Sequence, residues 1–99
     1  MADINQAEVK TMLEQKAEIL KAIAHPIRLC ILTKLLTDGI CNVTDMHCCL
    51  DAPQSTVSQH LAKLRSAGVV TTERNGLEVK YNIADEQVVK ILNIFLEEM

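Results

Sequence analysis

The sequence predicts a mainly helical winged helix-turn-helix fold, with five helices and a β-hairpin between the fourth helix and the fifth. Three observations predict it. Apolar residues recur at helical spacing over residues 7–67, the period then changes to strand-like alternation around Asn75-Gly76, and an apolar helix follows. A chain of 99 residues has the length of one domain, so residues 1–99 are expected to form a single domain.

The first helix is predicted over residues 7–23, where apolar residues are spaced three and four apart. These residues are Val9, Met12, Leu13, Ala17, Leu20 and Ile23. His25-Pro26 interrupts the stripe, because the residue before a proline avoids the helical region and proline favours a first helical turn. We therefore expect a second helix over about residues 26–37, ended by Asp38-Gly39.

A short third helix fits residues 43–50, with Asn42 as its N-cap. The turn at residues 51–53 leads into a fourth helix, because Pro53 is suited to a helix start. This fourth helix is expected to end near Ala67, before Gly68. Its inward residues are predicted to be Val57, Leu61 and Leu64.

Residues 69–74 are rich in β-branched types and are expected to be extended. Asn75-Gly76 is a strong hairpin signal, because both turn positions would need positive φ. Apolar and polar residues alternate over residues 77–83, which predicts the return strand. The last helix covers about residues 85–97 and is apolar around most of its circumference. It therefore needs two partners, its own core and a second subunit.

Composition excludes several classes of function. The chain has no Trp, one Tyr and one Phe, which excludes an aromatic stacking platform for single-stranded nucleic acid. It has no apolar run of membrane-spanning length and no secretory signal, so we expect a cytoplasmic protein with no membrane partner. It has no Gly-rich phosphate loop, and His25, His47 and His60 have no triad-like partners, so we do not expect an enzyme.

The net charge of −3 argues weakly against a nucleic-acid partner, but the charge is unevenly distributed. Residues 54–81 carry four basic and two acidic residues, a net charge of +2. A local positive face of this kind can dock on phosphates. Ordinary scatter of surface charge gives the same surplus, so charge alone does not decide the question.

The fourth helix opens with hydroxyl, amide and imidazole side chains, which can hydrogen-bond base edges and phosphates in a major groove. A solvated amphipathic surface is the alternative, but the helix before it and the hairpin after it favour DNA. Hairpin residues can reach a neighbouring backbone or minor groove. The candidate DNA-binding residues are Gln54, Ser55, Thr56, Ser58, Gln59, His60, Lys63, Arg74, Asn75 and Lys80.

The sequence resembles the ArsR/SmtB family of bacterial repressors in three segments, AIAHPIRLCIL, NVTDMHCCLDAPQSTVSQHLAKLRSAGVV and RNGLEVKYNI. The resemblance covers about residues 18–92. It is greatest to the branch with the anthrax toxin-operon repressor and the sulfur-responsive biofilm and haemolysin regulators. It implies a homodimer through the first and last helices, a recognition helix at residues 54–66 and a wing at residues 71–83. The implied partner is a double-stranded DNA operator with an imperfect inverted repeat.

The resemblance also implies places where such repressors bind an inducer, and this sequence departs from each of them. Asn42 and Thr44 stand at the Cys positions of the family's Cys-x-Cys-Asp metal motif. At the family's zinc site on the last helix, Asp85 matches, but Gln87 stands where a His is expected. The sulfur-responsive Cys pair aligns with Thr33 on the second helix, and the last helix has no Cys.

The four cysteines, Cys30, Cys41, Cys48 and Cys49, lie outside those places. Without an export signal, they are expected to be thiols and not a disulfide scaffold. Cys30 and Cys48 are expected on the solvent side of their helices. Cys41 precedes the third helix, where the helix dipole favours thiolate. Such thiols can bind a soft metal or arsenite, or be oxidised or persulfidated. The alternative is that they are half-buried structural residues.

Three functions remain open. The first is a homodimeric repressor whose operator binding is tuned by thiol chemistry. The second is the same DNA-binding repressor without a small-molecule inducer, controlled by expression level or by a partner protein. The third is a protein-interaction module on a winged-helix scaffold, which the Ser-, Gln- and His-rich helix face does not favour.

Overall fold

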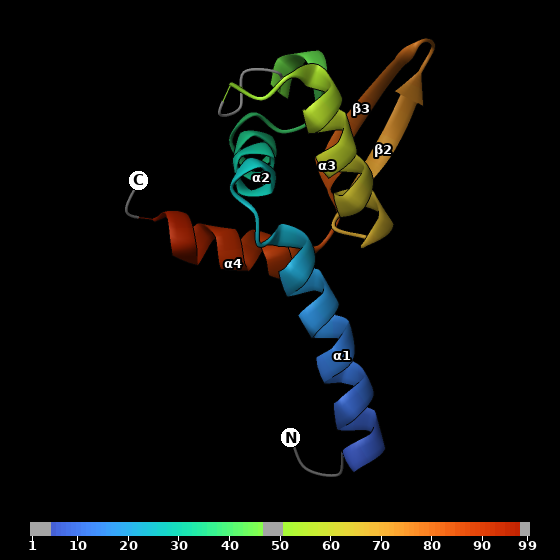
Figure 1. Cartoon of the computed structure of the whole chain (residues 1–99), viewed down its shortest axis with the longest axis vertical. Helices are drawn as coiled ribbons and strands as arrows, with labels where there is room; N and C mark the ends of the chain where they lie inside the picture. Colours follow the sequence, from blue (N-terminus) through green and yellow to red (C-terminus); the bar gives the residue numbers. More distant parts are fainter. Residues whose placement is uncertain (1–4, 47–50, 98–99) are drawn as a thin grey trace.

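The computed structural model describes residues 5–46 and 51–97. The elements in chain order are α1 (Gln6–Ile23), α2 (Pro26–Asp38), β1 (Cys41–Asn42), the 3-10 helix η1 (Thr44–Met46), α3 (Gln54–Ser66), β2 (Val70–Asn75), β3 (Glu78–Ile83) and α4 (Glu86–Leu96). Figure 1 shows α2 and α3 beside the β2–β3 hairpin, with α4 at the base of this body and α1 extending away from it. This is the mainly helical winged helix-turn-helix fold that the sequence predicts.

The break between α1 and α2 follows from His25-Pro26, as predicted. His25 is the N-cap of α2, with extended backbone at φ −156°, and its Nδ1 accepts a hydrogen bond from the Ile27 N–H at 3.1 Å. Pro26 is the first helical residue, where its missing N–H is not needed. At the other end of α2, Gly39 has φ +77° and its N–H donates to the Leu35 carbonyl at 2.9 Å.

The predicted third helix over residues 43–50 is wrong in its described part. Cys41–Asn42 form strand β1, which pairs with β3, and only Thr44–Met46 turn as a 3-10 helix. Asn42 is therefore a strand residue and not an N-cap, and its side-chain amide donates to Glu78 Oε1 at 2.7 Å. Pairing with a strand far along the chain overrides the local helical spacing. The rest of the predicted helix lies outside the described residues.

The wing is an antiparallel sheet in the order β1-β3-β2. Its hairpin register pairs Asn75 with Glu78, which leaves Gly76 and Leu77 as a two-residue turn. The predicted turn at Asn75-Gly76 is therefore one residue too early. Gly76 has φ +68°, and a glycine with positive φ at the first turn position is typical of a type II′ turn.

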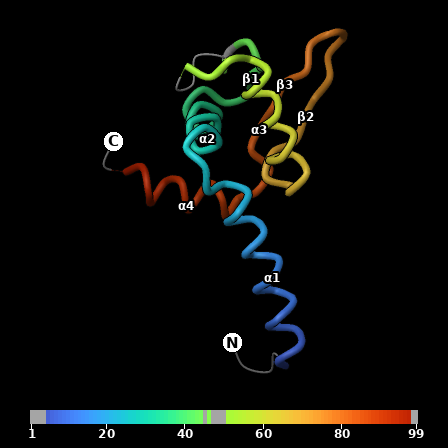
Figure 2. The backbone as a smooth tube through the Cα atoms, viewed as in Figure 1, coloured from blue at the N-terminus to red at the C-terminus, as the bar shows by residue number. Residues whose placement is uncertain are grey.

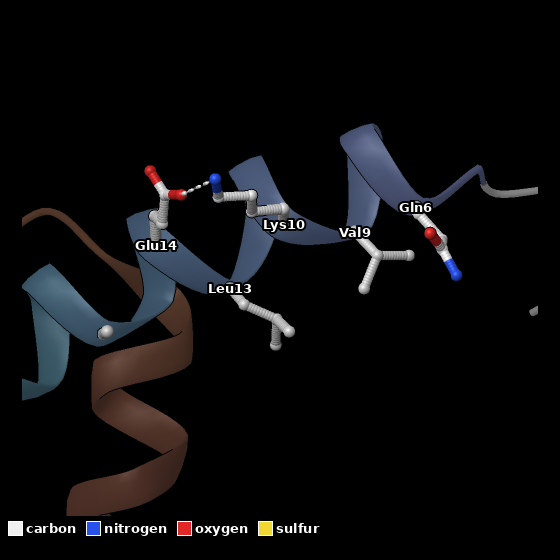
Figure 3. Close-up of a pocket in the computed structure, with 6 residues that line it drawn as sticks. Gln6, Val9, Lys10, Leu13 and Glu14 are labelled. Atoms are coloured by element: carbon white, nitrogen blue, oxygen red, sulfur yellow. Dashed lines mark ion pairs between the residues drawn. The ribbon is translucent and has the colours of Figure 1, made fainter.

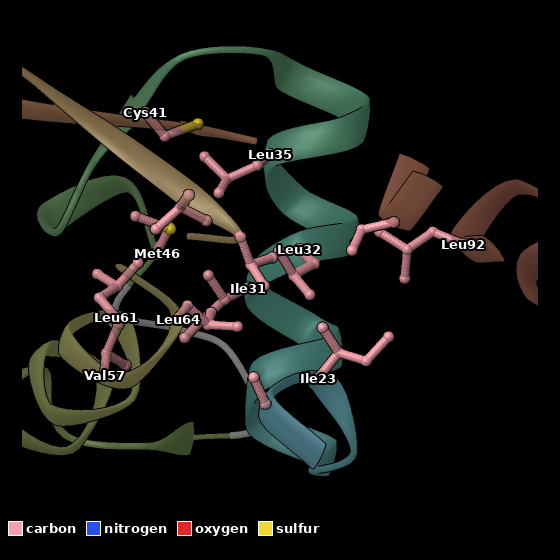
Figure 4. Close-up of a cluster of buried hydrophobic side chains, with 14 of the residues drawn as sticks. Ile23, Ile31, Leu32, Leu35, Cys41, Met46, Val57, Leu61, Leu64 and Leu92 are labelled. Carbon is pink, nitrogen blue, oxygen red and sulfur yellow. The ribbon is translucent and has the colours of Figure 1, made fainter. Parts of the chain in front are cut away.

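The hydrophobic core lies where α2, α3, α4 and the base of the sheet meet (Figure 4). Figure 4 shows Leu61 and Leu64 of α3 facing Ile31 of α2, while Leu92 of α4 lies beside Leu32. Val57 of α3 is buried together with Leu61 and Leu64, so one face of α3 packs against the core and the opposite face remains in solvent. The most deeply buried side chains are Ile31, Leu32, Leu35, Met46, Val57, Leu61, Leu64, Val69, Val70, Val88 and Leu92.

Helices α1 and α4 each keep large apolar side chains in solvent. Figure 2 shows the backbone of α1 running away from the core. Leu13 and Leu20 of α1 are 59% and 50% exposed, and Ile94 and Phe95 of α4 are 66% and 71% exposed. None of the described helices combines the length and the apolar character needed to cross a bilayer. The apolar last helix thus has an inward face in the core and an outward face in solvent.

Replacing a core residue of α3 should destabilise the fold. Leu61→Ala is expected to lower the free energy of unfolding by about 2–5 kcal/mol, because a buried side chain is lost and a cavity remains. Leu77→Ala is the matched control, since Leu77 is fully exposed in the turn, and its effect should stay within about 0.5 kcal/mol. Urea denaturation followed by circular dichroism at one protein concentration measures both. Equal effects would contradict this core.

Candidate nucleic-acid interface

The outward face of α3 is polar and lacks acidic groups. Because Val57, Leu61 and Leu64 attach the helix to the core, its other side chains face solvent. Thr56 and His60 are half-buried at the edge of this face. No residue of α3 is acidic, so nothing on the helix itself repels phosphate. The exposed predicted contacts on α3 are Gln54, Ser55, Ser58, Gln59 and Lys63, and Arg65 is exposed as well.

The three predicted wing residues do not lie on one face. Lys80 pairs in register with Glu73, and Arg74 is the next residue along β2. Because successive strand residues alternate between faces, Arg74 lies on the face of the buried Val70, while Lys80 and Asn75 lie on the other. Arg74 and Asn75 are exposed near the turn, and Lys80 is half-buried. The wing therefore offers two separate basic positions.

Arg28 connects α2 to α1 and to the middle of α3. Its Nε donates to His60 Nδ1 at 3.0 Å, and its Nη1 donates to the Ala22 carbonyl at 3.0 Å. The rings of His25 and His60 lie with their centroids 4.3 Å apart and their planes tilted by 40°. Arg28 is not among the DNA-binding candidates that the sequence predicts. The spacing in the sequence could have identified it, because Arg28 follows the N-cap residue His25 by three positions and therefore lies on the same side of α2.

The environment of His60 favours its neutral form. Partial burial lowers the pKa of His60 below its ordinary 6.5, and electrostatic interactions with His25, Arg28 and Lys63 lower it further. Because Nδ1 accepts the hydrogen bond from Arg28, the proton of the neutral ring is on Nε2. His60 is thus positioned as a hydrogen-bond donor through Nε2 at neutral pH.

A basic groove of about 580 Å³ continues from this cluster along the C-terminal half of α3. Its lining residues are Glu18, Lys21, Ala22, Arg28, Lys63, Ser66 and Ala67. The groove carries three cationic side chains and one carboxylate, Glu18, whose Oε1 lies 3.4 Å from Lys21 Nζ. Lys63 therefore belongs to a wider positive surface that extends to the last turns of α1.

The two described cysteines, Cys41 and Cys30, are buried and half-buried, respectively. Cys41 is buried in β1, in register with Tyr81, and its Sγ donates to the Gly39 carbonyl at 3.4 Å. The expectation that Cys41 precedes a helix whose dipole favours the thiolate is therefore wrong. Cys30 on α2 is half-buried. His47, Cys48 and Cys49 lie outside the described residues.

Among residues 5–46 and 51–97, no group of three or more His, Cys, Asp or Glu side chains is placed to hold a metal ion. Asp85 instead has a structural contact, because it is the N-cap of α4 and its Oδ1 accepts from the N–H groups of Gln87 and Val88. Asp85 thus satisfies two backbone N–H groups at the start of α4.

Comparison with known proteins gives consistent results. The family model described as "Bacterial regulatory protein, arsR family" matches residues 25–72. The chain is 46% identical over 84 residues to the transcriptional repressor PagR of Bacillus anthracis, covering 82% of this chain and 84% of PagR. It is 41% identical over 83 residues to the HTH-type transcriptional repressor SmtB of Mycobacterium tuberculosis, covering 84% of this chain and 61% of SmtB. Both relatives are described as transcriptional repressors.

Solved structures agree with this similarity. The crystal structure of PagR superposes with a TM-score of 0.79 at 43% sequence identity, covering 87% of this chain and 98% of PagR. The solution structure of the homodimeric winged helix-turn-helix DNA-binding domain of Mb0332 from Mycobacterium bovis gives a TM-score of 0.77 at 32% identity. That match covers 96% of this chain and 86% of the Mb0332 domain.

Proposed function

The chain belongs to the arsR family of bacterial regulatory proteins and is a winged-helix repressor of transcription, and we propose that it binds an inverted-repeat operator as a homodimer. The observation that carries this proposal is the outward face of α3, which combines hydroxyl, amide and cationic side chains with no carboxylate. Such a helix can enter a major groove, where hydroxyl and amide groups hydrogen-bond base edges.

The candidate contacts divide by chemistry and exposure. Exposed Gln54, Ser55, Ser58 and Gln59 are proposed to read base edges or to bind phosphates from α3. The half-buried Thr56 and His60 would contact DNA from the edge of this face. Lys63 and the wing residues Arg74, Asn75 and Lys80 are proposed as backbone contacts. With Arg74 and Lys80 on opposite wing faces, the two would reach different parts of the backbone.

The proposed homodimer forms through α1 and α4, whose outward faces are apolar. Figure 3 shows Val9 and Leu13 projecting from one side of α1, away from the Lys10–Glu14 ion pair. The outward Phe95 belongs to α4. Apolar surface in contact with water costs about 25 cal/mol per Å², so a second copy covering both helices would be stabilising. The Mb0332 domain, similar in fold, is described as homodimeric. Two-fold symmetry of such a dimer predicts the inverted repeat.

A charge placed on the outward face of α4 should separate the subunits. Phe95→Glu is expected to raise the dimer dissociation constant at least about tenfold, because a carboxylate would be buried among apolar groups. Leu77→Glu, at the fully exposed wing turn, is the control and should leave dimerisation unchanged. Sedimentation equilibrium measures both constants. A monomeric wild-type chain at all concentrations would contradict the proposed dimer.

Specific DNA binding can be measured by fluorescence anisotropy with promoter DNA from the gene's own locus. Gln59→Ala is expected to cost about 1–3 kcal/mol of binding free energy if it contacts a base. Lys63→Ala should weaken all sequences and reduce the salt slope of binding by about one. Lys10→Ala, whose side chain pairs with Glu14 on α1, is the control and should behave like wild type. Equal affinity for promoter and scrambled DNA would contradict the proposal.

We further propose that thiol modification releases the operator. The supporting observation is the place of Cys41, which is buried in β1 beside Tyr81 of the wing strand β3. A group added to its sulfur would not fit in the packed core around Cys41 and would disturb the β1–β3 pairing. Cys30 on α2 is the second described thiol. The competing proposal keeps the repressor without an inducer, under control of expression level or of a partner protein.

Thiol reagents distinguish these two proposals. Diamide, polysulfide, arsenite or cadmium should each be added to the wild-type operator complex, and at least one is expected to weaken binding about tenfold or more. Cys30→Ser, Cys41→Ala and a Cys48→Ser, Cys49→Ser double variant identify which sulfur responds. If no reagent changes the operator affinity, the thiols are structural and the inducer-free repressor is supported.

A further inference from the structure

We propose that Arg28 is a positioning residue for DNA recognition, which holds the His60 ring in the one tautomer whose Nε2–H can donate to the operator. The proposal rests on the proposed contact between α3 and DNA. It adds a residue of α2 that does not belong to the recognition helix or to the wing. Arg28 would act on the operator only through His60.

Two hydrogen bonds, one from Nη1 and one from Nε, hold the guanidinium of Arg28 in place. Nη1 donates to the Ala22 carbonyl in the last turn of α1, where helix carbonyls lack partners within the helix. Nε donates to His60 Nδ1, in the middle of α3. A planar guanidinium presents these two donors in a rigid arrangement, whereas the single ammonium of a lysine cannot. Arg28 therefore connects the helix proposed for dimerisation to the helix proposed to read DNA.

The hydrogen bond from Arg28 determines which nitrogen of His60 carries the proton. Nδ1 must keep its lone pair, so the neutral ring is protonated on Nε2. Within the described part of the chain, the hydrogen bond from Arg28 is the contact that His60 makes through Nδ1, and Nε2 is not among the bonded atoms. An imidazole N–H of this kind can donate to O6 or N7 of guanine or to a phosphate oxygen. The His25 ring packs 4.3 Å away and supports the same ring orientation.

Protonation of His60 would undo this arrangement. A second N–H would then point from Nδ1 at the Nε–H of Arg28, so the two donors would repel. The groups facing His60 in the described residues are His25 at the α1–α2 junction, Arg28 on α2 and Lys63 on α3, and all of them oppose a positive ring. Glu18, in the adjoining groove, is close to Lys21 instead. The neutral ring is therefore the form that the site supports.

The sign of the pH effect separates this mechanism from simple electrostatics. Protonated histidines attract phosphates, so a lower pH ordinarily strengthens DNA binding. Because the pKa of His60 lies below 6.5, wild-type operator binding should weaken as the pH falls below 6.5 and the ring is protonated, since Nδ1 can then no longer accept the hydrogen bond from Arg28. In His60→Gln, which keeps an amide donor but does not titrate, the ordinary strengthening should return.

The experiment is a double-mutant cycle on operator and scrambled DNA with Arg28→Lys, His60→Gln and the double variant. Arg28→Lys is expected to lower operator affinity about tenfold, the loss of roughly one base contact, while the scrambled-DNA affinity and the salt slope stay unchanged. In the His60→Gln background, the same change should have no effect. Lys10→Arg, a conservative change at an exposed residue of α1 that pairs with Glu14, is the matched control. Nitrogen-15 NMR of the unbound protein should show the Nε2–H tautomer in wild type and a tautomer mixture in Arg28→Lys.

Each contrary result has a definite meaning. If Arg28→Lys behaves like wild type while Arg28→Ala weakens both DNAs equally and lowers the salt slope by about one, Arg28 binds phosphate itself and the proposal is overturned. Equal losses on both DNAs with a lowered melting temperature show a purely structural role and also overturn it. A specific wild-type complex that Arg28→Lys leaves intact overturns this proposal alone. A wild-type chain without a specific complex overturns the proposed function, even where NMR shows the expected tautomer.

Discussion

The attachment of α3 to α2 through a few apolar side chains is the constraint on which the rest of the structure depends. Val57, Leu61 and Leu64 recur four and three residues apart, so their burial leaves α3 only one rotation about its axis. The polar face is exposed as a direct consequence of that rotation. The same core receives Val69 and Val70 at the start of β2, so the wing leaves the body at a fixed place beside α3. Packing thus determines the geometry of the proposed reading surface.

Local periodicity was sufficient to predict the four long helices and the hairpin, because each carries its own apolar spacing. It failed where a distant partner decides the structure. Cys41 and Asn42 are drawn into the sheet by β3, which no local rule anticipates, and this buries the Cys41 thiol. At the candidate DNA interface, the exposed residues of α3 could be predicted from the sequence, because the spacing of Val57, Leu61 and Leu64 identifies the buried face of the helix. The opposite faces of Arg74 and Lys80 required the strand register, and the contact of Arg28 with His60 required two helices to be packed together.

Positive and negative charges are segregated between elements of this molecule. The chain carries a net charge of −3, yet α3 has no acidic residue, and the groove beside it holds Lys21, Arg28 and Lys63. Acidic residues instead cluster from residue 85 onwards, in and around α4. A molecule with this asymmetry is oriented in the field of a polyanion, with α3 towards it and α4 away. Net charge is therefore a poor guide to nucleic-acid binding when the charges are segregated by element.

The extension of α1 beyond the core has a consequence for how repression would respond to protein concentration. Most helical stability in proteins comes from tertiary packing, and the buried residues of α1, Ala22 and Ile23, lie only in its last turn. For a repressor that dimerises through α1, ordering of this helix and association of the two chains would therefore occur together. Below the dimerisation constant, the concentration of the DNA-binding species then rises with the square of the chain concentration. A gene under its control would switch over a narrower range of repressor levels than a monomeric regulator could produce.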